Sequence, residues 1–350
     1  MKRVLITGNQ GFIGTWLSLY IKKVYPDVKI FGIDDRRSLG ERMIDFFPSN
    51  MLGSSSSLMN DIKLENLDEI TKFLTENNID TIFHLAAQAI VPRAFEEPNL
   101  TFQSNVVATF NILEASRNSK NVEKIALITS DKVYKNDNKS ELFEEGNIMS
   151  GKDIYSCSKV ICEHLAHAYR STHLKELASK IHTIRLGNVV GGGDYSVNRL
   201  IPDLIRAYLQ SEIFYVRYPN ATRPFQHVLD VCNGILNITL DDNHNYEGKL
   251  LEGWNLGPKN NSYAYVSEVI KSFSEYFPGL NIQQSPILYD EDIRLEISNQ
   301  KYAGRYDLPL FDSKTSIDHT LKWYQSVHLN TKDPLEATLD QINLYLENQL

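Results

Sequence analysis

The stretch "RVLITGNQGFIG", residues 3–14, joins an apolar run to three regularly spaced glycines. The glycines follow the apolar run directly and open the helix-period stretch "FIGTWLSLYIKKVY" (12–25). In such a strand–turn–helix unit, Gly8 permits a tight turn, Gly11 lets the backbone approach a pyrophosphate, and Gly14 allows close helix–strand packing. The stretch therefore predicts the first βαβ unit of a dinucleotide-binding domain.

The pattern of apolar runs extends this prediction over the first half of the chain. Further continuous apolar runs, each typical of a strand buried on both faces, occur at 29–34, 80–87, 123–130 and 182–190. Helix-period stretches separate them, at 68–78, 101–118 and 158–172. This alternation predicts an α/β fold with a doubly wound parallel sheet, the Rossmann arrangement.

The alternation ends after Asn188, where loop-rich segments and irregularly spaced helices follow. We therefore expect two domains. The first comprises residues 1–188, with about 228–256 returning to it, and binds the dinucleotide. A smaller substrate domain comprises 189–227 and 257–350.

Composition excludes several classes of protein. The 350 residues carry a net charge of −8, which argues against a nucleic-acid binder because phosphate neutralisation requires a basic face. The three cysteines include no CxxC pair, so we expect neither a disulfide framework nor a metal site. Neither a targeting signal nor an apolar stretch of about 20 residues is present, so we expect a soluble, cytoplasmic protein with no membrane partner.

Asp34 follows Gly14 by 20 residues, at the end of the second predicted strand. A carboxylate at this position accepts hydrogen bonds from the adenosine ribose and repels the 2′-phosphate of NADP, which favours NAD. Arg36 and Arg37 follow closely and offer the alternative, since they could hold that phosphate.

Tyr155 and Lys159 are four residues apart and so share one face of a helix. A lysine cation near a phenol lowers its pKa, and the tyrosinate can then act as a base toward a sugar hydroxyl.

With the glycine motif, this pair resembles the extended short-chain dehydrogenase/reductase superfamily, as do "HLAAQ" (84–88), Asn105 and Asn188. Within it, "TSDKVY" (129–134), "GKDIYSCSK" (151–159) and "RLGNVVGGGDYSVNRLIPDLIRA" (185–207) are similar to the CDP-glucose 4,6-dehydratase family. So are "RYPNATRPFQHVLDV" (217–231) and "WNLGP" (254–258). The resemblance implies that NAD is held by Gly8, Gln10, Gly11, Phe12, Ile13, Gly14, Asp34, Arg36, Asp61, Ile62, Leu85, Ala86, Ala87, Gln88, Asn105, Tyr155 and Lys159.

The pair Asp131–Lys132 is the discriminating feature of this resemblance, because related dTDP-glucose dehydratases have an acidic residue where Lys132 stands. A 4,6-dehydratase must oxidise C4, remove the C5 proton and expel the C6 hydroxyl. The resemblance implies that Tyr155 serves the oxidation, Lys132 removes the C5 proton and Asp131 protonates the departing hydroxyl. Ser130 or Thr129 relays the C4 proton to Tyr155. The alternative for Asp131–Lys132 is a surface ion pair at a strand end.

The same resemblance implies a nucleotide-sugar site. Arg223 is the main candidate for the substrate pyrophosphate, because a guanidinium suits bidentate phosphate contact. The other predicted substrate-binding residues are Asn188, Arg199, Leu200, Arg217 and Gln226, whereas His227 is expected to be structural. The segment 135–153 departs from the family, which commonly has an aromatic-rich stretch there.

The sequence thus predicts a lyase of deoxysugar and polysaccharide biosynthesis that converts CDP-D-glucose to CDP-4-dehydro-6-deoxy-D-glucose. The alternatives are the same elimination on another nucleotide hexose (GDP-, UDP- or dTDP-linked, or N-acetylated), and a nucleotide-sugar 4-epimerase, which does not need the Asp–Lys pair. Apolar residues on more than one side of the helices at 101–116 and 158–170 predict a homodimer or a dimer-built oligomer.

Overall fold

The computed structural model describes residues 1–34, 57–59, 62–137, 142–248, 252–285, 293–330 and 332–349, of which 57–59 are described by their backbone alone. Two of the predicted cofactor residues, Arg36 and Asp61, lie outside these ranges, as do Arg37 and part of the divergent 135–153 segment. No described helix is long and apolar enough to cross a membrane.

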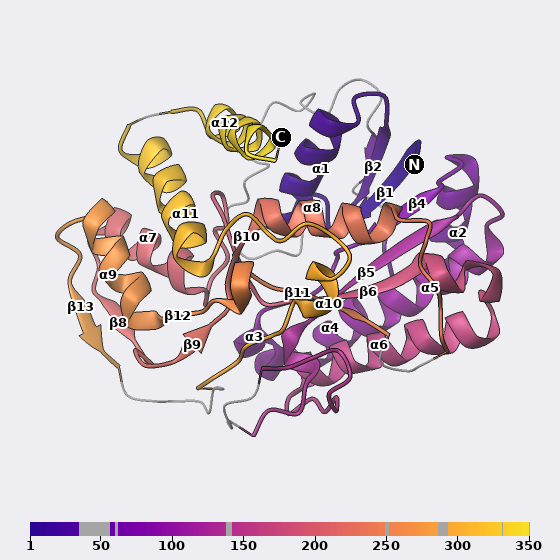
Figure 1. The fold of residues 1–350 in the computed structure, drawn as a ribbon, viewed down its shortest axis with the longest axis horizontal. Helices are drawn as coiled ribbons and strands as arrows, with labels where there is room; N and C mark the ends of the chain where they lie inside the picture. Colours follow the sequence, from indigo (N-terminus) through magenta and orange to yellow (C-terminus); the bar gives the residue numbers. More distant parts are fainter. Residues whose placement is uncertain are drawn as a thin grey trace.

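A seven-stranded parallel sheet forms the centre of the first part of the structure (Figure 1). Its strand order is β11-β6-β5-β4-β1-β2-β3, so the sheet reverses direction of winding between β1 and β4. The strands are β1 (Arg3–Thr7), β2 (Lys29–Ile33), β3 (Ser57–Met59), β4 (Thr81–His84), β5 (Lys124–Ser130), β6 (Ile181–Leu186) and β11 (Trp254–Leu256). This confirms the predicted doubly wound α/β fold.

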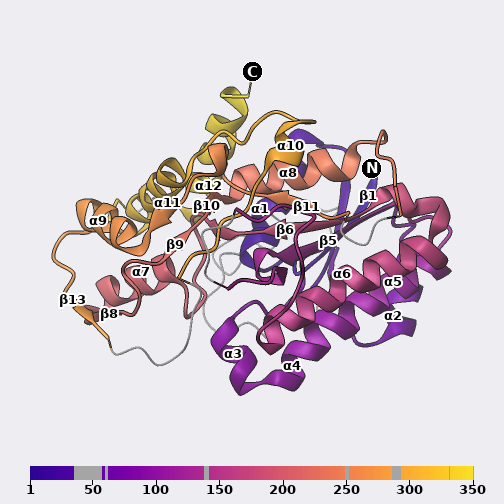
Figure 2. The same ribbon diagram turned by 60° about the horizontal axis from the view of Figure 1, so that its bottom comes forward.

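Helices cover both faces of the sheet, as Figure 2 shows. On one face, α1 (Phe12–Val24) and α8 (Val228–Leu240) pack together on the strands. The other face carries α2 (Leu67–Glu76), α5 (Ala108–Asn118) and α6 (Ile154–Thr172). Short helical segments complete this part: α3 (Val91–Glu96), α4 (Pro98–Phe102), η2 (Gln103–Val107), η3 (Asp131–Val133) and η4 (Lys175–Lys180).

The second part of the structure lies beyond the carboxyl ends of the strands, and its described residues form three short strand pairs. These are β7 (Asn188–Val190) with β10 (Phe225–His227), β8 (Phe214–Val216) with β13 (Ile282–Gln284), and β9 (Thr222–Arg223) with β12 (Ala264–Tyr265). The helical segments are α7 (Leu200–Gln210), η5 (Lys259–Asn261), α9 (Val266–Tyr276), α10 (Gln300–Ala303), α11 (Ser313–His328) and α12 (Pro334–Glu347).

Asp230 on α8 ties this second part to the first. Its carboxylate accepts hydrogen bonds from the backbone amides of Leu310 and Phe311, at 2.8 and 3.0 Å, and from the Tyr345 hydroxyl on α12, at 2.7 Å. The C-terminal helix therefore returns to pack beside α1 and α8. The division into two domains at the predicted boundaries stays a prediction.

Two elements differ from the pattern expected. The run 182–190, predicted as one strand, divides at Gly187 into β6, which pairs with β5, and β7, which pairs with β10. A β-carbon at Gly187 would lie 2.9 Å from Pro224, so the chain leaves the main sheet where only a glycine fits. The predicted helix at 101–118 is interrupted by the π-helical segment η2.

Candidate active site

The glycine loop between β1 and α1 is packed tightly against its surroundings. Gly8 has a φ of +71°, and a β-carbon there would lie 2.9 Å from the Ala86 amide nitrogen. A β-carbon on Gly14 would lie 2.1 Å from the Gly8 carbonyl oxygen. The loop therefore requires glycine at both positions. Helix α1 begins at Phe12, with Gly11 as its N-cap. Because the turn is tight, a pyrophosphate can approach the N-terminus of this helix.

Asp34 and the loop after β4 border this turn. The Asp34 carboxylate accepts a hydrogen bond from the Gln10 amide at 3.1 Å, which fixes the acid beside the glycine loop. The Asn105 side chain accepts from the Gln88 amide at 2.8 Å and donates to the Gln88 carbonyl at 3.1 Å. It also donates to the Ser158 hydroxyl at 2.9 Å, so Asn105 joins the β4 loop to α6.

The described cofactor candidates thus gather where β1, β2, β4 and β5 end, at the point where the sheet changes direction. In open α/β sheets, nucleotides bind in the crevice at this point. The residues present fit a dinucleotide, since they offer a helix N-terminus, a close-packed glycine turn and an acid at the end of the second strand. Ile62, Leu85, Ala86 and Ala87 are partly buried beside these elements.

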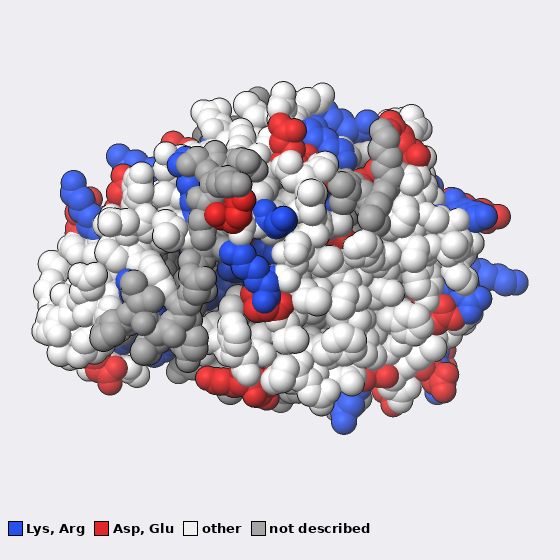
Figure 3. Space-filling view, turned by 90° about the horizontal axis from the view of Figure 1, so that it is seen from below, with Lys and Arg blue, Asp and Glu red and all other residues white. Residues whose placement is uncertain are grey.

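A cavity of about 290 Å³ opens next to this crevice, between the sheet and the second part of the structure. Viewed from below, Lys and Arg side chains gather in a recess between the two parts (Figure 3). The predicted residues that line the cavity are Ser130, Asp131, Lys132, Tyr155, Asn188, Arg199, Leu200, Arg217 and Arg223. The structure thus brings predicted catalytic and substrate residues from β5, α6, β7, α7 and β9 together.

Asp131 and Lys132 lie on η3, the short helical turn that directly follows β5. The Ser130 hydroxyl caps this turn by accepting from the Lys132 amide at 3.2 Å, and it donates to the Asp131 carboxylate at 3.1 Å. Asp131 is only 3% exposed, which does not fit a surface ion pair. Thr129 points elsewhere, because its hydroxyl donates to the buried Glu163 carboxylate at 2.6 Å. Only Ser130 of these two hydroxyls lines the cavity.

Tyr155 lies in the first turn of α6, which Asp153 and Ser156 cap reciprocally. Burial raises the pKa of Tyr155 to about 12, although a hydrogen bond with Ser130 lowers it, and the Asp131 carboxylate raises it further. Burial thus outweighs the groups that lower this pKa, and the lowering by Lys159 stays a prediction. Lys159 is itself buried, which lowers its pKa, and its ammonium donates to the Ile128 carbonyl at 3.0 Å.

Gln226, which was predicted to bind substrate, and His227, which was expected to be structural, both lie away from the cavity. Gln226 on β10 is fully buried, does not line the cavity, and has no hydrogen-bond partner for its side-chain amide within the described ranges. His227 is also fully buried, between the rings of Trp16 and Phe311, and caps α8 by accepting from the Leu229 amide at 3.3 Å. The geometry agrees with a structural role for this histidine.

Several lining residues were not predicted from the sequence. They are mostly apolar or aromatic and come from the β4–α3 segment, β8, α9 and α11, with Asp194 and Asp203 adding carboxylates: Ala89, Ile90, Val91, Pro92, Phe214, Tyr215, Val216, Val266 and Thr320. The residues 214–216 directly precede Arg217, so their position in the chain was the available signal. Thr320 is distant in sequence, and nothing local marks it.

A second cavity, of about 990 Å³, lies at the opposite ends of β6 and β11. It is lined by Arg170, His182, Trp254 and Lys301 among others, and by none of the predicted site residues. Its larger volume does not make it the active site, because the glycine loop, Tyr155 and Lys132 all lie at the other edge of the sheet.

Comparisons with known proteins agree with this geometry. Residues 4–255 match the family described as "NAD dependent epimerase/dehydratase family". The chain is 32% identical over 278 residues to CDP-glucose 4,6-dehydratase of Salmonella typhimurium, a match that covers 77% of this chain and 74% of that protein.

Solved structures show the same fold for both activities. Alignment with a Bacillus anthracis dTDP-glucose 4,6-dehydratase in complex with NAD gives a TM-score of 0.77 at 21% identity, covering 94% of this chain and 98% of that one. Alignment with a Thermus thermophilus UDP-glucose 4-epimerase complex with NAD gives 0.78 at 22% identity, covering 92% and 99%. The family match over most of the chain, the glycine loop and the Tyr155–Lys159 pair together show that this chain belongs to the NAD-dependent epimerase/dehydratase family of extended short-chain dehydrogenases/reductases.

Proposed function

We propose that the chain is a nucleotide-sugar 4,6-dehydratase, and that its substrate is CDP-D-glucose. The observation that carries this proposal is the presence of Asp131 and Lys132 in the same cavity as Tyr155. An epimerase requires one group to exchange the C4 hydroxyl proton, whereas a dehydratase needs two more proton transfers, at C5 and at the C6 oxygen. The relative CDP-glucose 4,6-dehydratase supports the choice of substrate.

NAD, when bound, supplies the hydride acceptor for C4 and, once reduced, the hydride donor for C6. The chain would hold its pyrophosphate at the glycine loop and the N-terminus of α1, and its adenosine ribose at Asp34. The carboxylate of Asp34 favours NAD over NADP.

Ser130 and Tyr155 would serve the oxidation. The Ser130 hydroxyl lies beside Tyr155 in the cavity, so it can pass the C4 hydroxyl proton to the phenol oxygen. Thr129 cannot, because Glu163 holds its hydroxyl outside the cavity. Tyr155 must lose its proton to accept this one, which requires positive charge nearby to offset the effect of burial.

Lys132 and Asp131 would serve the elimination that follows. Once C4 is a ketone, the C5 proton becomes acidic, and Lys132 in its neutral form can remove it. Asp131 in its protonated form can then donate a proton to the departing C6 hydroxyl, which leaves as water. Both side chains are on one three-residue turn, so a single sugar position can present C5 and C6 to them.

Arg223, with Arg199, would hold the nucleotide diphosphate, and Arg217 would lie near the nucleobase. The three arginines come from separate elements and line the same cavity, where guanidinium groups can contact phosphate oxygens. Aromatic and apolar side chains at 214–216 border this end and suit a nucleobase face.

The alternatives are the same elimination on a GDP-, UDP- or dTDP-linked hexose or an N-acetylated one, and a 4-epimerase. The test is incubation of the purified protein with each nucleotide sugar, followed by detection of the 4-keto-6-deoxy product. Formation of this product from CDP-glucose at the highest kcat/KM supports the proposal. An epimerised sugar with no ketone would contradict it.

We further propose a homodimer formed through α4, α5 and α6, acting in the cytoplasm in deoxysugar and polysaccharide biosynthesis. Phe102, Phe110 and Ile154 on these helices are 44%, 41% and 45% exposed, which leaves apolar surface for a second copy to cover.

A further inference from the structure

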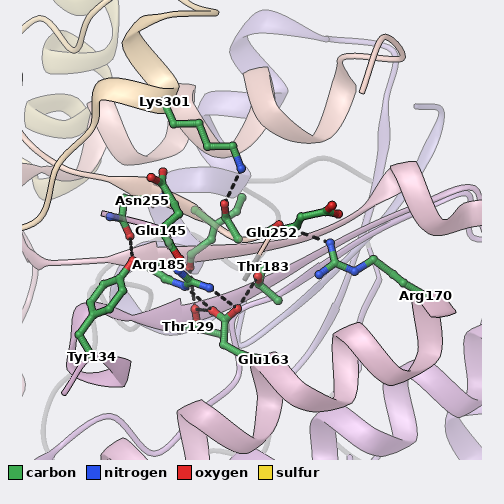
Figure 4. Close-up of polar contacts among 12 residues, drawn as sticks. Thr129, Tyr134, Glu145, Glu163, Arg170, Thr183, Arg185, Glu252, Asn255 and Lys301 are labelled. Carbon is green, nitrogen blue, oxygen red and sulfur yellow. Dashed lines mark hydrogen bonds and ion pairs between the residues drawn. The ribbon is translucent and has the colours of Figure 1, made fainter. Parts of the chain in front are cut away.

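The side chains of Glu163 and Arg185 form a buried, bidentate ion pair beneath the active site (Figure 4). Arg185 donates from Nε to Glu163 Oε1 at 3.0 Å and from Nη2 to Oε2 at 2.9 Å, and the side chains are 0% and 1% exposed. Neither residue lines the cavity. A buried ion pair adds little net stability compared with apolar packing. Stability alone therefore does not explain why this pair is present.

The pair contacts the chain on both sides of the catalytic turn. On the N-terminal side, the Thr129 hydroxyl donates to Glu163 Oε1 at 2.6 Å. On the C-terminal side, Arg185 Nη1 donates to the Tyr134 hydroxyl at 2.8 Å, and this hydroxyl donates to Asn255 Oδ1 at 2.6 Å. Thr129 and Tyr134 directly flank residues 130–133.

We propose that Glu163 and Arg185 are positioning residues that hold the catalytic turn at both ends, through Thr129 and Tyr134. The inference rests on the proposed dehydratase activity. Proton transfer at C5 and at the C6 oxygen requires Lys132 and Asp131 within hydrogen-bond reach of the substrate, and small displacements cost rate steeply. A three-residue 3₁₀ turn has too few internal hydrogen bonds to fix this position alone.

The arrangement affects the two halves of the reaction differently. Lys132 and Asp131 lie on the turn between the two contacts, whereas the oxidation uses Tyr155, in the capped first turn of α6, and Ser130, which directly follows Thr129. Weakening the contact at Tyr134, on the Lys132 side of the turn, therefore slows elimination more than C4 oxidation, whereas weakening the contact at Thr129 slows both steps. A general loss of stability would not separate the two steps.

Two mild substitutions test this. Tyr134→Phe removes the hydroxyl that connects Arg185 with Asn255. Thr129→Val removes the hydroxyl that donates a hydrogen bond to Glu163. Both keep the side-chain size and leave the ion pair intact, so the fold is retained. Tyr134→Phe should slow elimination about 10-fold, as loss of a hydrogen bond to a charged group allows, while C4 oxidation changes less than about 3-fold. In single turnovers of this variant with CDP-glucose, reduced cofactor should therefore accumulate. Thr129→Val should slow both steps, because Ser130 follows Thr129 directly.

Thr183→Val is the matched control. Its hydroxyl also donates to Glu163, at 2.7 Å to Oε2, but it lies on β6 and not beside the catalytic turn. It should leave the ratio of the two rates unchanged. Equal slowing of both steps in the Tyr134 variant, or a changed ratio in the Thr183 variant, would overturn the inference.

A second measurement needs no substrate. Hydrogen–deuterium exchange of the amides in the 130–136 peptide should become faster in Tyr134→Phe and Thr129→Val, and stay unchanged in Thr183→Val. Unchanged exchange in all three variants would overturn the positioning role, even if the wild-type protein converted no nucleotide sugar. Absence of any turnover by the wild type would count against the proposed function alone.

Discussion

In the proposed reaction, Tyr155 serves the oxidation at C4 and Lys132 serves the elimination, and the two residues lie on different elements. Tyr155 belongs to a long, capped helix, and Lys132 to a short turn at the end of β5. Because C5–H is not acidic until C4 is oxidised, the two residues act in sequence. Their contributions can therefore be separated by substitution.

Lys132→Ala should retain C4 oxidation and lose elimination. Reduced cofactor should accumulate with CDP-glucose present, and exchange of the C5 hydrogen with deuterated solvent should slow by about 10²- to 10⁴-fold, the usual loss on removing a general base. Lys135→Ala, which removes an exposed lysine outside the cavity, is the control. Near wild-type exchange in the Lys132 variant would assign the base to another residue.

Arg223→Ala should mainly weaken substrate binding. Loss of a charge-assisted phosphate contact costs about 2–3 kcal/mol, so KM should rise about 30- to 150-fold while kcat changes little. Arg294→Ala is the control, because Arg294 pairs with Glu296 at 2.7 Å and does not line the cavity. Steady-state kinetics with CDP-glucose measure both constants, and an unchanged KM for Arg223→Ala would place this arginine outside the substrate site.

Some residue-scale questions could not be resolved from the sequence. Thr129 and Ser130 are adjacent hydroxyls, and only the tertiary contact of Thr129 with Glu163 shows that Ser130 faces the cavity. Gln226 was selected because its neighbours match a substrate segment, but it is buried and does not line the cavity, whereas the preceding Phe225 does. The pKa of Tyr155 depends on burial, which sequence spacing does not reveal.

At the scale of elements, the sequence pattern predicted the strands and helices correctly where the sheet is covered by helices on both faces. The apolar runs at 3–8, 29–34 and 123–130 became β1, β2 and β5. The division of 182–190 into β6 and β7 was not predictable, because it depends on β5 ending at Ser130 and on β10 offering a new partner. The π-helical segment η2 likewise has no local signal.

The start of α8 allows a prediction about pH. Burial, and secondarily His319, lowers the pKa of His227 to about 3, whereas an unfolded histidine titrates near 6.5. Between about pH 3 and 6.5, the unfolded state therefore binds more protons at this histidine than the folded state does. The free energy of unfolding consequently falls as the pH falls below about 6.5. When the pH falls from 7 to 5, the free energy of unfolding of the wild type should decrease by roughly 2 kcal/mol because of His227.

His227→Phe fills the same aromatic surroundings without a titrating group. Its free energy of unfolding, measured by urea denaturation at pH 7 and 5, should fall by roughly 2 kcal/mol less than that of the wild type. His164→Phe, at an exposed position, should keep the wild-type dependence on pH. Equal falls for the wild type and His227→Phe would contradict the assigned cause.

At the scale of the whole molecule, the parallel sheet and its cofactor edge were predictable, because a repeated βα pattern allows few topologies. The second part was predicted only in outline, since its short strands pair over long separations in sequence. The C-terminal helix illustrates the limit. Nothing near Tyr345 indicates that its hydroxyl contacts Asp230, more than a hundred residues earlier.

The proposed dimer predicts that charges on α4 and α5 will separate the protomers. Phe102→Asp combined with Phe110→Asp would place two carboxylates in an apolar contact, so light scattering at micromolar concentration should change from dimer to monomer. Leu209→Asp, at a residue 47% exposed on α7, should leave the dimer intact. A monomeric wild-type protein would contradict the proposal.

The central claim is that the cavity carries out oxidation, elimination and reduction on one sugar. The most direct measurement uses CDP-glucose labelled with deuterium at C4, followed by mass spectrometry and NMR of the product. The account predicts a 4-keto-6-deoxy sugar that carries this deuterium at C6, with a solvent-derived hydrogen at C5. A product that keeps the deuterium at C4 and contains no ketone would identify an epimerase and contradict the role assigned to Asp131 and Lys132.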